Sequence, residues 1–149
     1  MTAATALRYG FRAEVAVGYD EAVARTRAAL ADEGFGVLTE IDVRATLKRK
    51  LDVDFRPYVI LGACNPPLAH RALDREIDIG LLLPCNVVVY AGERPGASLV
   101  AVLDPVVQLG VTGRRDLEPL AEEVRDRLRL VLEKVRRGPA APTMNSEER

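Results

Sequence analysis

The sequence has only two cysteines and one histidine among its 149 residues. Two cysteines are too few for a secreted disulfide framework, and a reducing cytosol would keep both as thiols. The first fourteen residues lack the apolar stretch of a signal peptide, and no later run approaches the length that spans a membrane. These absences predict a cytoplasmic protein that makes no use of a membrane.

An excess of charge of one sign is also missing. The 21 basic and 22 acidic side chains leave a formal net charge of -1, so no global field attracts nucleic acid or an anionic membrane. The sequence contains no glycine-rich phosphate loop, no serine–histidine–aspartate order and no Cys-x-x-Cys pair. We therefore expect neither nucleic acid nor membrane as a partner, and no motif identifies a cofactor.

The composition is that of a globular protein, with 48% hydrophobic and 29% charged residues. A chain of this length suits one domain with a single core. We expect that domain over residues 11–137. Residues 1–10 are predicted to be a flexible N-terminus, and residues 138–149, which have no hydrophobic periodicity, a disordered tail.

Hydrophobic periodicity predicts five strands and four helices. The expected strands are 11–18, 35–43, 58–63, 81–91 and 98–104, and the expected helices are 20–33, 44–51, 66–78 and 116–137. The segment GERPG between the last two strands is typical of a hairpin loop, which makes those strands antiparallel. This order predicts an α+β fold: a two-layer α/β sandwich with a mainly antiparallel five-stranded sheet and helices on one face. The opposite face must meet water or a partner subunit.

A cysteine, a helix start and the single histidine lie close together in ILGACNPPLAH, residues 60–70. Asn65 is a good N-cap and Pro66 suits the first helical position, so a helix is predicted to begin just after Cys64. The amides and dipole of that helix would favour the Cys64 thiolate. Burial of Cys64 as a small core residue at the end of an apolar strand is an equal alternative.

The strand register decides whether the second cysteine joins the first. If Ala91 faces Ser98 across the hairpin, antiparallel counting places Cys85 opposite Asp104. If strands 58–63 and 81–91 are also adjacent and antiparallel, Cys64 and Cys85 are neighbours. A parallel crossover would instead separate the two cysteines by a full strand length.

Other polar residues give weaker signals. His70 lies at the flank of its helix face, where a structural histidine is the favoured interpretation, and Cys-x5-His is not a recognised zinc spacing. No metal site is predicted. Glu40 and Asp42 are expected on the sheet face opposite Phe35 and Val37, as solvated strand residues rather than an acid–base pair.

Four segments carry a family resemblance: GFGVLTEIDV, the F-R-P-Y segment at 55–58, GACNPPLAH and LLPCNVVVY. Over about residues 11–135 the sequence resembles domain of unknown function 302 (DUF302). The resemblance implies a β-α-β(4)-α domain like the TATA-binding-protein-like folds, commonly seen as dimers. It implies no activity, because the family name records none, and a fold of this kind does not itself imply DNA binding.

Two hypotheses for function follow. The first is a small-ligand or thiol-redox site, with Cys64 and Cys85 as its reactive residues and Asn65, His70, Asn86 and Asp104 binding the substrate or cofactor. The second is a non-enzymatic module that uses the uncovered sheet face to form a homodimer or to hold another protein, with both cysteines structural.

Overall fold

The computed structural model describes residues 5–138. Residues 1–4 of the predicted flexible N-terminus and residues 139–149 of the predicted tail lie outside the described residues. The strands are β1 (Thr5–Ala6), β2 (Gly10–Val15), β3 (Gly36–Asp42), β4 (Tyr58–Cys64), β5 (Cys85–Ala91) and β6 (Ser98–Leu103). The helices are α1 (Tyr19–Asp32), α2 (Val43–Leu51), α3 (Pro66–Arg75), α4 (Pro105–Gly110) and α5 (Glu118–Arg137), with short 3₁₀ helices η1 (Ile77–Leu82) and η2 (Arg115–Leu117).

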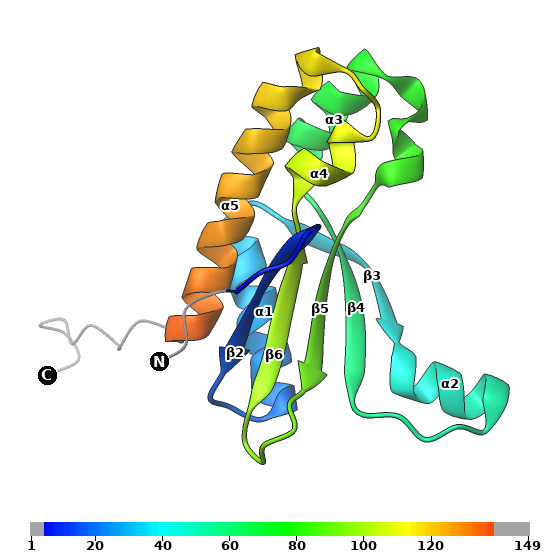
Figure 1. The fold of residues 1–149 in the computed structure, drawn as a ribbon, viewed down its shortest axis with the longest axis vertical. Coiled ribbons are helices and arrows are strands. Elements are labelled where there is room, and N and C mark those ends of the chain that lie inside the picture. The colour runs from blue at the N-terminus through cyan, green and yellow to red at the C-terminus, as the bar shows by residue number, and fades with distance from the viewer. Residues whose placement is uncertain (1–4, 139–149) are drawn as a thin grey trace, which may run out of the picture.

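All strands belong to one sheet of order β1-β2-β6-β5-β4-β3, in which every neighbouring pair is antiparallel (Figure 1). The predicted fold class is therefore confirmed, but the number of strands is six rather than five. The additional strand is β1, whose residues Thr5 and Ala6 pair with Arg12 and Phe11 of β2. Two residues are too short for an alternating pattern to be visible in the sequence.

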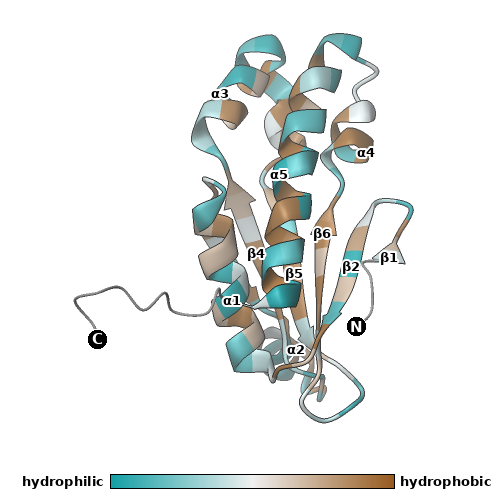
Figure 2. Cartoon of the chain, turned by 90° about the vertical axis from the view of Figure 1, so that its left-hand side faces the viewer, coloured by the Kyte–Doolittle hydropathy of each residue, from teal (hydrophilic) through white to brown (hydrophobic). Residues whose placement is uncertain are grey.

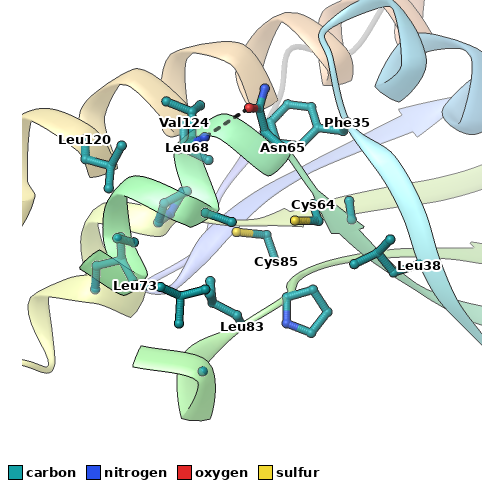
Figure 3. Close-up of a pocket in the computed structure, with 17 residues that line it drawn as sticks. Phe35, Leu38, Cys64, Asn65, Leu68, Leu73, Leu83, Cys85, Leu120 and Val124 are labelled. Carbon is teal, nitrogen blue, oxygen red and sulfur yellow. Dashed lines mark hydrogen bonds between the residues drawn. The ribbon is translucent and has the colours of Figure 1, made fainter. Parts of the chain in front are cut away.

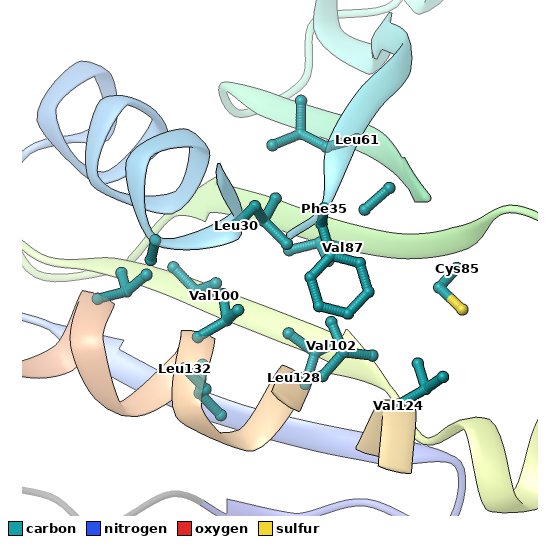
Figure 4. Close-up of a cluster of buried hydrophobic side chains, with 14 of the residues drawn as sticks. Leu30, Phe35, Leu61, Cys85, Val87, Val100, Val102, Val124, Leu128 and Leu132 are labelled. Carbon is teal, nitrogen blue, oxygen red and sulfur yellow. The ribbon is translucent and has the colours of Figure 1, made fainter. Parts of the chain in front are cut away.

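Two long helices, α1 and α5, cover one face of the sheet (Figure 2). Helix α5 turns one apolar side inward at helical spacing, and its buried residues are Leu120, Ala121, Val124, Leu128, Val131, Leu132 and Val135. They meet strand residues such as Val87 and Val100, which are fully buried (Figure 4). The predicted one-sided helical layer is thus present, and we call the uncovered side of the sheet the open face. No helix within residues 5–138 has the length and apolar character needed to cross a bilayer.

The register that the sequence predicts for the central strands is confirmed. Ala91 pairs with Ser98 across the hairpin, and Val87 pairs with Val102 further along. Strands β4 and β5 are adjacent and antiparallel, with Ala63 opposite Cys85. The end of β4 therefore lies beside the start of β5, as the neighbouring-cysteine hypothesis requires.

A β-bulge changes the predicted faces of β3. The register shifts between Val37 and Thr39, so Leu38 is an extra residue in this strand. Beyond the bulge Glu40 faces the helices, where it pairs with Arg27 of α1, and the Asp42 side chain accepts a hydrogen bond from Ala45 N at the start of α2. The expectation that Glu40 and Asp42 lie opposite Val37 is wrong, because one inserted residue reverses the alternation.

The chain between β4 and β5 and the chain after β6 form a cap over one end of the sheet (Figure 1). The predicted helix 66–78 ends earlier, at Arg75, and continues as η1, while the predicted strand 81–91 begins only at Cys85. Helix α4 was not expected. Together with the first turns of α5, these elements enclose the region that the cysteines face.

Candidate functional site

A cavity of about 320 Å³ separates the end of the sheet from this cap, and we call it the cysteine cavity (Figure 3). Its walls come from β3, β4, α3, η1, the start of β5, α4 and α5. The lining includes Phe35, Leu38, Cys64, Asn65, Leu68, Leu73, Leu83, Cys85, Leu109, Leu120 and Val124. None of the described residues that line it carries a charge, so the cavity is an apolar pocket containing two thiols and one amide.

The β3 bulge and the segment before β5 shape the entrance to the cavity. Leu38, the extra residue of the bulge, lines the cavity although its surface is 66% exposed to solvent. Leu83 and Pro84, joined by a cis peptide bond, line the wall next to Cys85. Because Leu38 is both exposed and part of the lining, the cysteine cavity has an opening to solvent at this bulge.

Cys64 ends β4, and the next residue starts α3 as the sequence predicts. The Asn65 side chain accepts a hydrogen bond from Leu68 N at 3.3 Å, and Pro66 follows in the first turn. This bond occupies the Asn65 oxygen and holds the half-buried Cys64 at the cavity wall. Asn65 therefore has an N-cap role, and its amide nitrogen lies beside Gly34, which does not line the cavity.

Cys85 begins β5 and is buried beneath α4. Its thiol donates a hydrogen bond to Gln108 Oε1, with 3.6 Å between sulfur and oxygen. The Gln108 amide nitrogen in turn donates to the Leu82 carbonyl, which ties α4 to η1. No sequence signal points to Gln108, because a lone glutamine in the segment after β6 belongs to no motif.

Burial raises the pKa of both thiols. The pKa of Cys85 rises from its ordinary value of 9.0 to about 11, mainly through desolvation and secondarily through the nearby Cys64. Desolvation also raises the pKa of Cys64. Both effects disfavour the thiolate. At neutral pH the cavity therefore presents two neutral thiols, in contrast to the low-pKa thiolate expected beside a helix start.

The other three predicted site residues lie outside the cysteine cavity. His70 points to solvent from α3, with 76% of its side chain exposed, and its Nε2 lies 3.6 Å from Asp74 Oδ2. Asn86 follows Cys85 in β5 and so lies on the open face, since successive strand residues alternate. Asp104 caps α4 by accepting a hydrogen bond from Val106 N at 2.9 Å. The structure thus brings together Cys64, Cys85 and Asn65 only.

The described residues contain no group of three or more histidine, cysteine or carboxylate side chains placed to hold a metal ion. The chemistry of the cysteine cavity points instead to noncovalent binding. Its apolar walls exclude charge, and its polar groups are weak hydrogen-bond donors and acceptors. Small-molecule sites commonly have this character: an apolar concave surface with a few polar groups that orient the ligand.

The fold and site define a class of protein: a two-layer α+β domain whose helical cap encloses an apolar cavity at one end of an antiparallel sheet. The chain belongs to the DUF302 family, whose model, "Domain of unknown function DUF302", matches residues 11–135. A solved structure with the same architecture is the "uncharacterized conserved protein DUF302 from Bacillus stearothermophilus". The two chains share 32% sequence identity with a TM-score of 0.79, over 87% of this chain and 100% of the other. No curated protein matches this chain.

Proposed function

We propose that the chain binds a small, uncharged, mainly apolar molecule in the cysteine cavity. The observation that carries this proposal is the cavity itself, which has about 320 Å³ of space lined without a charged side chain. Known ligand pockets begin at roughly this volume and are lined mainly by hydrophobic side chains. A charged ligand would lose its hydration there without gaining an ion pair, so the apolar lining selects against it.

The two thiols orient the ligand in this proposal rather than attack it. Burial keeps both protonated at neutral pH, and a protonated thiol is a poor nucleophile. The Cys85 proton is already committed to Gln108. Cys64 therefore supplies the contact that orients the ligand, and its polarizable sulfur suits an unsaturated or aromatic apolar group.

Filling the cavity tests the proposal. We expect the neutral fluorophore N-phenyl-1-naphthylamine to bind the wild-type protein, and Ala69→Phe to weaken its affinity more than tenfold. Ala69 lines the cavity from α3, so the added ring occupies the space that the probe needs. The affinity is measured by fluorescence titration. Thermal unfolding of each variant verifies that its stability equals that of the wild type.

Ala31→Phe provides the matched control, because it adds the same ring at an exposed position of α1. Its affinity for the probe should equal that of the wild type. Equal affinities for all three proteins, or a folded wild-type protein that does not bind the probe, would contradict the proposal.

Helix α2 favours a second candidate function, homodimerisation. None of its nine residues is buried within the chain, and it projects from the end of β3 away from the other helices (Figure 1). The apolar side chains of Leu51, Val53 and Phe55 that follow its last turns are exposed. An isolated helix this short is only marginally stable in water. Packing of the 43–55 segment against the same segment of a second copy would cover these side chains and stabilise the helix.

Sedimentation equilibrium tests this candidate. We expect the wild-type protein to be a dimer at micromolar concentration and the double variant Leu51→Glu/Phe55→Glu to be a monomer, because the introduced charges would be buried without partners. Leu130→Glu, at an exposed leucine of α5, should leave the dimer intact. A wild-type protein that remains monomeric at 100-fold higher concentration would show that α2 has another role.

A further inference from the structure

A second cavity, of about 310 Å³, lies on the open face of the sheet, and we call it the tyrosine cavity. Its floor includes Val88 of β5 and Ala101 of β6, which are paired in the register. These two small side chains leave a hollow in the sheet surface. Leu7 and Tyr9, from the turn between β1 and β2, form one wall.

Aromatic rings form the opposite wall. Tyr58 and Tyr90 are directly paired in β4 and β5, and their rings stack with 5.2 Å between centroids and 9° between planes. The Arg56 guanidinium lies 6.0 Å from the centre of the Tyr90 ring. Tyr9 approaches from the other side, close enough that its phenol adds to the raised pKa of Tyr58, which burial and Tyr90 raise more strongly. The tyrosine cavity therefore has one wall of stacked aromatic rings, with Tyr9 in its lining opposite.

One positively charged side chain, Arg12, lines this cavity. Arg12 projects from β2 into the lining, is half-buried, and has no ion pair among the described residues. Glu14 lies two residues further along the same side of β2, but it pairs with Arg94 of the hairpin loop instead. No acidic residue in the described part of the chain lines the cavity. A half-buried guanidinium without a carboxylate is a site of positive potential suited to an anion.

Asn86 adds an uncommitted amide to the same cavity. Its side chain is exposed on the open face and makes no hydrogen bond within residues 5–138. An amide offers both a donor and an acceptor. The cavity thus combines flat apolar walls, one unpaired cation and one free amide, which together define the orientation of a ligand.

From this combination we propose that the tyrosine cavity binds a small planar aromatic carboxylate. The ring lies over Val88 and Ala101 and against the stacked tyrosines, and the carboxylate accepts hydrogen bonds from Arg12. Asn86 hydrogen-bonds a polar substituent on the ring. The volume accommodates one bicyclic ring system, and the site lies across the sheet from the cysteine cavity and is independent of it.

The charges favour a small anion over a second copy of the chain on this face. In a face-to-face dimer, Arg12 of each copy would need an acidic partner from the same face of the other copy. Glu14 is the acidic residue that the described strands present there, and Arg94 neutralises it. Such a dimer would bury Arg12 without a partner, which is strongly unfavourable.

A pair of isosteric probes tests the proposal: 2-naphthoate carries the carboxylate, and 2-naphthamide is its neutral counterpart. We expect the wild-type protein to bind naphthoate at least tenfold more tightly than naphthamide, by calorimetric titration. Arg12→Met should remove that preference, whereas Arg115→Met, which removes an exposed arginine from η2, should retain it. Equal binding of the two probes, or a preference that survives Arg12→Met, would overturn the proposal.

Two further variants locate the binding site. Val88→Phe fills the hollow without changing charge and should abolish naphthoate binding, while Ala69→Phe in the cysteine cavity should leave it unchanged. The reverse result would place naphthoate in the cysteine cavity and overturn the proposal. A folded wild-type protein that does not bind naphthoate would also overturn the proposal. A second copy of the chain covering the open face would give this result.

Discussion

Cys85 in the folded, reduced protein is expected to react with iodoacetamide about 100-fold more slowly at pH 8 than an ordinary cysteine. The thiolate is the reacting species. The pKa of Cys85 is raised from 9.0 to about 11, which lowers the thiolate fraction at pH 8 about 100-fold. Because desolvation raises this pKa, reactivity increases with pH and reaches half its maximum near pH 11 rather than near pH 9.

Mass spectrometry of the alkylated peptides follows each cysteine separately. Cys64 should also react more slowly than an ordinary thiol, because its pKa is raised in the same direction by burial. Urea-unfolded protein is the reference, in which both residues should label at the same ordinary rate. A half-maximal rate for Cys64 well below pH 9 would support the activated thiolate and favour the thiol-redox hypothesis over ligand binding.

Replacing Gly62 with alanine is expected to destabilise the fold by about 1–3 kcal/mol, the usual cost of an overpacked core position. Gly62 lies in β4, opposite Thr39 of β3. An added Cβ would clash with Thr39 Oγ1 and lie 2.8 Å from Pro84 Cγ. Since Pro84 lines the cysteine cavity, the clash would also displace one of the cavity walls.

Gly36→Ala is the matched control for this change, because an added Cβ at Gly36 in the adjacent strand meets nothing within 4 Å. Urea unfolding should show that this variant is at least as stable as the wild type. Thr39→Ala combined with Gly62→Ala should recover part of the lost stability, as the contact with Pro84 remains. Equal stability of Gly62→Ala and Gly36→Ala would mean that the strands relax without cost.

The consecutive residues Cys85 and Asn86 line two different cavities. Cys85 and Asn86 are consecutive in β5, yet Cys85 lines the cysteine cavity under the cap and Asn86 lines the tyrosine cavity on the open face. A strand places successive side chains on opposite faces. The sequence pair Cys-Asn therefore contributes to both proposed sites, one apolar and one cationic.

The sequence by itself determined most of the local structure and the order of the layers. Period-two alternation identified β2 and β3, Asn65 and Pro66 marked the start of α3, and the GERPG loop made β5 and β6 antiparallel. The predicted pairing of Ala91 with Ser98 holds in the structure. These features depend on neighbours along the chain, so their signals are contained in short stretches of sequence.

Only the tertiary structure decided which side chains share a site. It places His70 and Asn86 outside the cysteine cavity and uses Asp104 as a helix cap. It also brings Gln108 to Cys85 from 23 residues away. Burial raises the pKa of both thiols, and burial is not readable from the sequence around either cysteine. Burial and cavity shape depend on how distant elements pack. A single bulged residue in β3 was enough to reverse the predicted faces of Glu40 and Asp42.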